Sequence, residues 1–241
     1  MGPRLLALDT STDRLAVALA DGPRQWLACE AGGARASARL IPCLMELLQG
    51  AGLRPADLDA IAFGAGPGAF TGVRSACAVA QGLAFGLQRP VLPIDSLMVV
   101  AEDAHAQLGR PVASLWVTMD ARMDEIYAAR YQPTADGWWV LDAPALWSLP
   151  ALLQRWQVQP PDCVVGSAIE AFGARLPTGS AWRVPGERDR AQALLSIARR
   201  QWALGHSVAA AQAGPVYLRD KVALTTAERE AASAQRAATS S

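Results

Sequence analysis

The chain of 241 residues holds few of the groups from which catalytic and metal sites are built. It has two histidines, His105 and His206, and neither belongs to an H-x-x-x-H or H-E-x-x-H pattern. A histidine-based metal site is therefore not expected. A Gly-x-Ser-x-Gly turn, which would present a serine nucleophile, is also missing. These absences argue against a metallopeptidase and against a serine hydrolase.

The chain also carries no excess of positive or negative charge. Basic and acidic side chains number 22 each, and the basic ones form no run. The chain alone is therefore not expected to bind a nucleic-acid backbone well. No apolar stretch approaches the roughly 20 residues that span a bilayer, and residues 1–9 lack the features of a signal peptide. The cysteines stand singly, which indicates buried free thiols in a reducing compartment and predicts a cytoplasmic location: Cys29, Cys43, Cys77 and Cys163.

What the sequence does contain is one pattern that occurs twice. The first half predicts strands at 4–9, 14–20, 25–30 and 58–63, with helices at 35–50 and 72–87. The second half predicts strands at 112–120, 125–131, 137–142 and 163–166, with helices at 148–157 and 190–204. Asp9 and Asp120 stand at equivalent strand ends. Both halves thus follow the order β-β-β-α-β-α, which predicts an α/β fold with two mixed sheets and flanking helices.

The repeat also suggests where the chain divides. Gly109, Arg110 and Pro111 interrupt the pattern, so an N-terminal lobe at 1–108 and a C-terminal lobe at 109–225 are expected. Residues 226–241 carry no apolar stripe and are expected to form a disordered tail.

Residues 64–74, Gly-Ala-Gly-Pro-Gly-Ala-Phe-Thr-Gly-Val-Arg, form the most distinctive segment. Glycine and proline restrict its path to a tight turn between a strand and a helix, and Thr71 is expected to cap that helix. The segment lacks the Gly-Lys-Ser/Thr of a Walker A loop. Its main expected role is to set the start of the helix, with Phe70 as a packing anchor. An anion held by the free amides near Thr71 and Gly72 is the alternative.

The two helices of the first half carry more apolar surface than one sheet face requires. Either the second half of the chain covers the surplus, or another subunit packs against it. The alanines and glycines of the second helix would let another backbone come close. The partner-binding residues expected on these helices are Leu40, Cys43, Leu44, Leu47, Phe70, Val73, Ala76, Ala80 and Leu83.

Two polar clusters follow the equivalent strand ends. Asp9, Thr10 and Ser11 could hold a Mg²⁺-bound phosphate as a degenerate nucleotide site, or Asp9 could simply cap backbone amides in a turn. Asp120, Arg122 and Asp124 could form an ion-pair corner or a polar site between the halves. Neither cluster predicts a bound cofactor.

The chain resembles the bacterial TsaB (YeaZ) family over about residues 3–224. The resemblance rests on five segments in order: Leu-Ala-Leu-Asp-Thr-Ser-Thr (6–12), Gly-Pro-Gly-Ala-Phe-Thr-Gly-Val-Arg (66–74), Ala-Gln-Gly-Leu-Ala (80–84), Asp-Ala-Arg-Met-Asp-Glu-Ile-Tyr (120–127) and Pro-Val-Tyr-Leu-Arg (215–219). It implies two tandem lobes of the actin-like ATPase (ribonuclease-H-like) fold. One departure is Ala36-Ser37, where family members often have His-Ser or His-Thr, so no role of that histidine is carried over.

The resemblance also implies a function. Family members act in making N6-threonylcarbamoyladenosine next to the anticodon of ANN-decoding tRNAs. TsaB is the non-catalytic dimerization subunit, pairing through its two N-terminal helices with its catalytic paralogue TsaD. The ATPase TsaE joins the pair, and TsaC supplies threonylcarbamoyl-AMP. The same helices could form a homodimer, and tRNA contact is expected only through the complex. An actin-like ATPase or kinase using Asp9 is the alternative function, and a glycoprotease-like metallopeptidase is the remote one.

Overall fold

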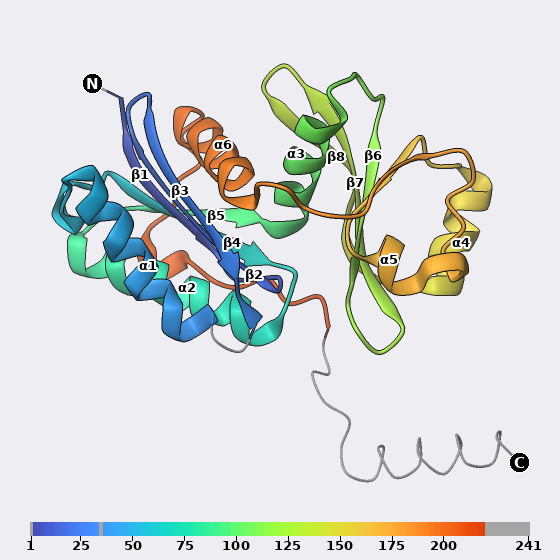
Figure 1. Ribbon diagram of the computed structural model, residues 1–241, viewed down its shortest axis with the longest axis horizontal. Coiled ribbons are helices and arrows are strands. Elements are labelled where there is room, and N and C mark those ends of the chain that lie inside the picture. The colour runs from blue at the N-terminus through green and yellow to red at the C-terminus, as the bar shows by residue number, and fades with distance from the viewer. Residues whose placement is uncertain (1, 34–35, 220–241) are drawn as a thin grey trace, which may run out of the picture.

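The computed structural model describes residues 2–33 and 36–219, which form two α/β lobes side by side (Figure 1). The first contains β1 (Arg4–Asp9), β2 (Arg14–Asp21), β3 (Arg24–Ala31), α1 (Ala36–Ala51), β4 (Ala60–Gly66), α2 (Phe70–Leu87), β5 (Val91–Asp95) and α3 (Ser96–Leu108). The second contains β6 (Leu115–Asp120), β7 (Glu125–Thr134), β8 (Gly137–Ser148), α4 (Leu149–Val158), β9 (Cys163–Val165), α5 (Ala168–Phe172), β10 (Trp182–Val184) and α6 (Arg190–Ala203). The 3₁₀ turns are η2 (Pro55–Asp57), η3 (Gly173–Arg175) and η4 (Ala210–Gln212).

In the described ranges the two sheets have the same topology. The first is ordered β3-β2-β1-β4-β5 and the second β8-β7-β6-β9-β10. In each, three strands form an antiparallel meander and two more are added in parallel. The fold class predicted from the repeat is confirmed, because each half of the chain forms a five-stranded mixed sheet with flanking helices.

Strand β2 shows why the first sheet is covered on both faces. Leu15, Val17 and Leu19 point into the core shared with α1 and α2, whereas the alternate alanines point into the core shared with α6. Successive side chains of a strand face opposite ways, so large residues fill one side and small ones let α6 approach closely on the other.

The last helix of each half packs on the sheet of the other half. Helix α6 lies on β1, β2, β3 and β5, and α3 contacts strands of the second sheet. The layers therefore run from α1 and α2 through the first sheet, α6 with α3, and the second sheet to α4 and α5 (Figure 1). The two lobes share the α3–α6 layer, so α6, predicted from the sequence as part of the second half, covers the first.

The predicted order β-β-β-α-β-α was incomplete. The first half also contains β5 with α3, and the second half α5 with β10, and none of these four elements was predicted. The helix at 190–204 therefore corresponds to α3 and not to α2, whose counterpart is the five-residue α5. Strand β10 has only three residues, too few for a period to be recognised.

The described residues leave two expectations open. The division between the lobes at 108/109 coincides with the end of α3 and a left-handed Gly109, and it stays a prediction. The disordered tail expected at 226–241 also stays a prediction, because it lies outside the described residues. Within 2–33 and 36–219, none of the helices combines the length and the apolar character that crossing a membrane requires.

A hydrogen bond between the two sheets ties the lobes at their junction. The Tyr131 hydroxyl of β7 donates to Asp95 Oδ2 at the end of β5 over 2.5 Å, and Asp95 Oδ1 accepts from the Leu97 amide at the start of α3. Removal from water raises the pKa of Asp95 despite these hydrogen bonds. It also raises the pKa of Tyr131, which thus stays protonated as a donor.

We expect Asp95→Asn to gain stability relative to the wild type as pH rises from 4 to 7. A carboxyl whose folded pKa is raised contributes stability that is complete below its unfolded pKa, about 3.9, and lost as pH rises through the folded pKa. Asparagine cannot ionise and escapes that loss. Urea unfolding of both proteins at several pH values measures the difference in free energy of unfolding, and a difference that stays constant would contradict the assignment.

Asp57→Asn is the control with the opposite sign. Arg54 lowers the pKa of Asp57 to about 2, so its contribution is present above pH 4 and lost as pH falls toward 2.

Candidate functional site

The glycine-rich turn packs directly against the end of β1. A Cβ added at Gly64 would overlap the Asp9 carboxylate, at Gly68 the Ser11 carbonyl oxygen, and at Gly72 the Thr10 carbonyl oxygen. These three positions therefore require glycine because another chain segment fills the space of a side chain. The Gly66–Pro67 peptide bond within the turn is cis.

Helix α2 starts earlier than predicted, and Thr71 does not cap it. The N-cap is Ala69, which makes no side-chain capping bond, and Thr71 lies inside the first turn. The turn is instead held from outside, since the Ala69 amide donates to Ser11 O over 2.7 Å and Thr10 Oγ1 donates to Gly72 O over 2.6 Å. The end of β1 therefore determines where α2 begins.

Asp9 forms a buried ion pair with Arg190, the first residue of α6. Arg190 Nη2 lies 3.0 Å from Asp9 Oδ2 and donates to Ser11 Oγ over 2.8 Å, and Nη1 lies 2.5 Å from Glu187 Oε2. Asp9 and Arg190 are both inaccessible to solvent. Burial acts to lower the pKa of Arg190, but the charges of Asp9 and Glu187 raise it above its ordinary value, so the guanidinium stays charged.

This arrangement does not fit a Mg²⁺–nucleotide site at Asp9. Oδ1 accepts from the Ser11 amide over 2.6 Å, and Oδ2 is bound by Arg190 and by the Ser96 hydroxyl. The guanidinium thus supplies the positive charge that a metal would bring. Across the described ranges, His, Cys, Asp and Glu side chains form no group of three or more that would hold a metal ion. The alternative of an ATPase or kinase using Asp9 loses its motivating residue.

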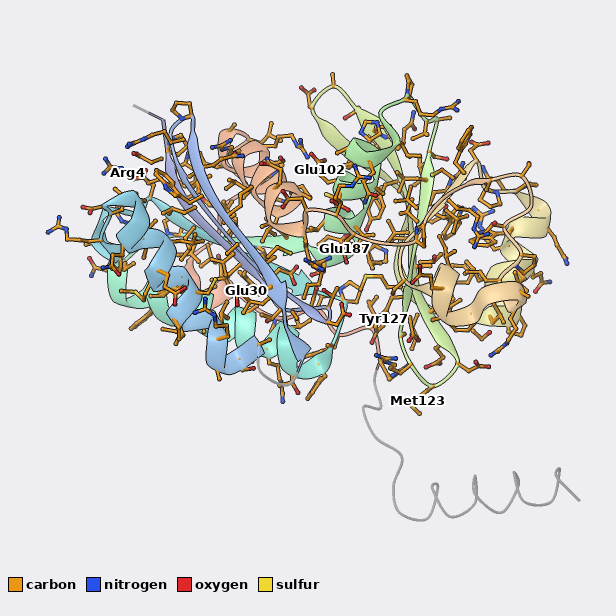
Figure 2. The ribbon with its side chains drawn as sticks, viewed as in Figure 1. Arg4, Glu30, Glu102, Met123, Tyr127 and Glu187 are labelled. Carbon is orange, nitrogen blue, oxygen red and sulfur yellow. The ribbon has the colours of Figure 1, made fainter. Side chains whose placement is uncertain are left out.

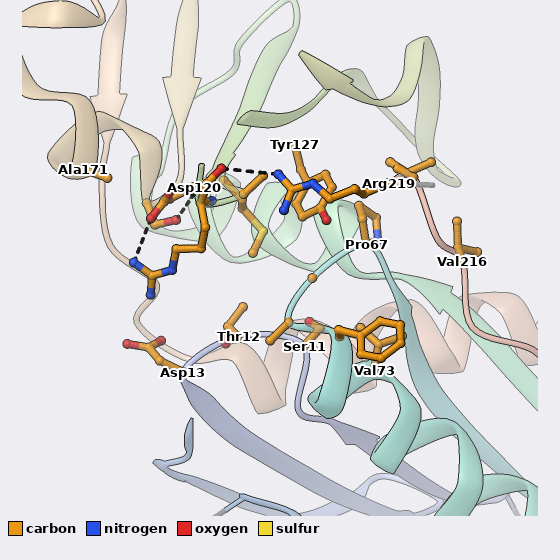
Figure 3. A pocket seen from close by; sticks show the side chains of 18 of the residues that line it. Ser11, Thr12, Asp13, Pro67, Val73, Asp120, Tyr127, Ala171, Val216 and Arg219 are labelled. Atoms are coloured by element: carbon orange, nitrogen blue, oxygen red, sulfur yellow. Dashed lines mark hydrogen bonds and ion pairs between the residues drawn. The ribbon is translucent and has the colours of Figure 1, made fainter. Parts of the chain in front are cut away.

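A cleft of about 570 Å³ opens between the lobes above this ion pair (Figure 3). Ser11, Thr12 and Asp13 line it from the first lobe together with the turn from Pro67 to Phe70, and Figure 2 shows Glu187 at the junction. The second lobe contributes Met119, Asp120, Ala121, Arg122, Tyr127, Ser167, Glu170 and Ala171. The cleft carries more carboxylates than arginines, so its charge opposes the binding of a free anion such as a phosphate.

Asp120 repeats the turn geometry of Asp9 but not its burial. Asp120 Oδ1 accepts from the Arg122 amide over 2.8 Å, and Oδ2 pairs with the exposed Arg122 side chain at 3.0 Å. Asp9 is thus a turn carboxylate that accepts from a backbone amide, one of the two alternatives that the sequence offered for it. Asp120 and Arg122 form an ion-pair corner, whereas Asp124, predicted as its third member, pairs with Arg175 at 2.6 Å. Arg122, Met123 and Asp124 have φ between 54° and 65°, an uncommon run of left-handed residues.

Residues 215–219, here called the strap, cross the mouth of the cleft. The Val216 amide donates to Ala65 O over 2.7 Å. The Tyr217 ring packs on Phe70 at 5.4 Å, and its hydroxyl accepts from Arg74 Nε over 2.8 Å. Arg219 Nη2 lies 2.5 Å from Glu125 Oε2 in the second lobe. Phe70, predicted as an anchor at the contact with a partner, thus packs against the chain's own strap.

The structure separates the nine residues predicted for partner binding into three groups. Leu40, Cys43, Leu44, Ala76 and Ala80 are buried in the core of the first lobe, so the sheet accounts for them. Phe70 and Val73 line the cleft. Leu47 of α1 and Leu83 of α2 are half-buried and pack against the core of the first lobe. Their part in partner binding stays a prediction.

The surface of α1 and α2 that points away from the sheet is nevertheless apolar. Ile41 is 54% exposed, Met45 45% and Phe85 77%. In the described residues the second half of the chain reaches α2 through 208–213 and through Tyr217 of the strap, and it leaves Ile41, Met45 and Phe85 exposed. We define the outer face as the exposed residues Ala38, Ile41, Pro42 and Met45 of α1 with Ala78, Gly82, Phe85 and Gly86 of α2.

Two stripes of small residues run along opposite sides of α2. Ala76, Ala80 and Ala84 face inward and are fully buried, whereas Ala78, Gly82 and Gly86 face outward at the same spacing of four. A Cβ at Gly82 or Gly86 would meet nothing within 4 Å. Ser37 and Ser75 share a hydrogen bond of 2.6 Å that holds α1 beside α2. The sequence alone does not distinguish the two stripes, because their residues are equally small.

Two known proteins that share one description are similar to this chain over most of its length. The "tRNA threonylcarbamoyladenosine biosynthesis protein TsaB" of Escherichia coli (strain K12) is 33% identical over 229 residues, which are 91% of this chain and 96% of that protein. The protein of the same description from Haemophilus influenzae is 34% identical over 232 residues, 90% of this chain and 94% of that protein.

Solved structures and a family match agree with these relatives. The structure of YeaZ from Pseudomonas aeruginosa superposes with a TM-score of 0.80 at 38% identity, covering 90% of this chain and 100% of that one. The sequence model of the TsaD family, described as tRNA N6-adenosine threonylcarbamoyltransferase, matches residues 32–145.

Proposed function

Since the chain belongs to the TsaB (YeaZ) family, we propose that it acts in making N6-threonylcarbamoyladenosine in tRNA as a non-catalytic subunit. Its partner is a paralogue of the TsaD family, which transfers the threonylcarbamoyl group from threonylcarbamoyl-AMP to N6 of the adenosine next to the anticodon. A TsaE-like ATPase completes the assembly in the cytoplasm, and tRNA is contacted only through the complex.

The outer face of α1 and α2 is the observation that carries this proposal. Ile41 and Met45, one turn apart on α1, and Phe85 on α2 expose large apolar side chains, and each buried side chain of this size contributes roughly 1.5–3 kcal/mol. Gly82 and Gly86 leave room for the backbone of an approaching helix. A helix pair of matching shape would form a four-helix contact with this surface.

The likeness to TsaD supports a paralogue as the occupant. The TsaD-family match spans residues 32–145 and thus includes α1 and α2. Two proteins with similar helix pairs can pack them about a pseudo-two-fold axis, as identical copies do in a symmetric dimer. A homodimer through the same face is the state expected when the paralogue is absent.

A non-catalytic role is supported by the contacts of the side chains that could otherwise take part in catalysis. Asp9 is neutralised by Arg190, and Asp120 by Arg122. His105 packs edge-on against Trp138, with 5.5 Å between ring centroids. General acid–base catalysis needs a titratable group within reach of a substrate, and these side chains are occupied with their own neighbours.

Reconstitution tests the proposal. Unmodified ANN-decoding tRNA is incubated with threonylcarbamoyl-AMP and the TsaD and TsaE proteins of the same organism, with and without this chain, and modified adenosine is measured by mass spectrometry. We expect modification only when this chain is present, and none with this chain alone. Full modification without the chain would refute a required subunit, and modification by the chain alone would refute a non-catalytic one.

A further inference from the structure

Arg190 is a charged side chain that is inaccessible to solvent and takes no part in the proposed partner contact. It starts α6, whose chain arrives from β10 of the second lobe. From there its guanidinium holds two segments together: Asp9 and Ser11 at the end of β1, and Glu187 at the cleft.

Stability alone does not account for this residue. Replacing a buried ion pair by apolar side chains of similar volume is often neutral or stabilising. Within the described residues, Arg190 Nε is moreover buried without a hydrogen-bond partner, which costs free energy. A charge kept in the core at such a cost points to a role in positioning.

The contacts around Arg190 lead directly to the start of α2. Ser11, whose hydroxyl accepts from Arg190, uses its carbonyl to accept the Ala69 amide at the N-cap of α2. Between Asp9 and Ser11, Thr10 donates to the Gly72 carbonyl in the first turn. Since Gly64, Gly68 and Gly72 leave no room for side chains here, a shift of residues 9–11 must move the turn and the helix with it.

We propose that Arg190 is a positioning residue that fixes the end of β1 and, through it, the start of α2 and the orientation of the outer face. The second lobe thereby takes part in partner binding without touching the partner. The inference rests on the proposed function only for the identity of the protein that binds the outer face.

Two variants test this role. Arg190→Met leaves Asp9 buried without its counter-charge and is expected to be strongly destabilised. The double variant Asp9→Asn with Arg190→Met removes both charges, retains the Ser11 amide bond through the asparagine oxygen, and should keep a melting temperature near that of the wild type. Leu152→Ala is the control, because it creates a cavity in the core of the second lobe, distant from α2.

Hydrogen–deuterium exchange and partner affinity are the readouts. In the double variant we expect amides of residues 64–76 to exchange at least tenfold faster and affinity for the TsaD-family paralogue to fall at least tenfold. Leu152→Ala, although less stable, should change neither by more than twofold. Wild-type exchange and affinity in the double variant would overturn the inference. If the wild type itself fails to bind the paralogue, the proposed function fails, and the exchange measurement still decides the inference.

Discussion

Ala78→Arg is expected to abolish binding of the TsaD-family paralogue while leaving the chain folded. Ala78 stands on the outward stripe of α2 with Gly82 and Gly86, where a long charged side chain would hold another helix away. Charges at the centre of an apolar contact, and steric overlap there, typically cost more than 2 kcal/mol, so the dissociation constant should rise at least about 30-fold. Titration calorimetry measures the affinity, and reconstituted tRNA modification should be lost in parallel.

Two matched variants make this result interpretable. Val158→Arg introduces the same charge at an 80% exposed site of α4 and should bind the paralogue as the wild type does. Ala80→Arg, two residues further along α2, points the other way into the core and should unfold the lobe because an unpaired charge is buried. Retained binding by a folded Ala78→Arg protein would show that the outer face is not the interface.

Gly72→Ala is expected to be among the most damaging single-methyl additions in the chain. A Cβ here would overlap the Thr10 carbonyl oxygen, a backbone atom that cannot rotate away, so β1 and α2 must separate. Overpacking of this kind costs on the order of 3 kcal/mol, which for a chain of this size lowers the melting temperature by roughly 10 °C. Circular dichroism melting of the isolated protein measures the loss.

Gly82→Ala on the same helix is the matched control and should act in the opposite direction. Nothing lies within 4 Å of a Cβ at Gly82, and alanine favours a helix over glycine by about 0.5–1 kcal/mol, so the melting temperature should rise by roughly 2–3 °C. If both substitutions had the same effect, close packing of β1 against the turn would not be the reason for glycine at position 72.

The repeat of strands and helices was predictable because it depends on local periodicity. The first strand of each three-strand meander was recognisable as an apolar run that ends in a carboxylate, Asp9 in β1 and Asp120 in β6. The strand β10 and the helix α5 were not, since three and five residues hold too little of a period. The family could also be recognised from the sequence, because the glycine-rich turn and four further segments match residues typical of that family.

The residues of the site were predicted less well because burial is decided by tertiary packing. Every alanine of α2 is equally apolar in the sequence, but Ala76, Ala80 and Ala84 pack on the sheet while Ala78 is left outside. Arg190 carried no signal at all, since it lies 181 positions from Asp9 and looks like any arginine at the start of a helix.

The sequence by itself determined the two lobes, the special status of residues 64–74 and membership of the TsaB family, because these depend on residue order and on conformational limits that glycine and proline impose locally. Only the tertiary structure decided which face of α2 is free and that a guanidinium from the far end of the chain neutralises Asp9. The physical reason is that exposure and buried charge pairing depend on segments that meet only once both sheets and the shared α3–α6 layer have packed.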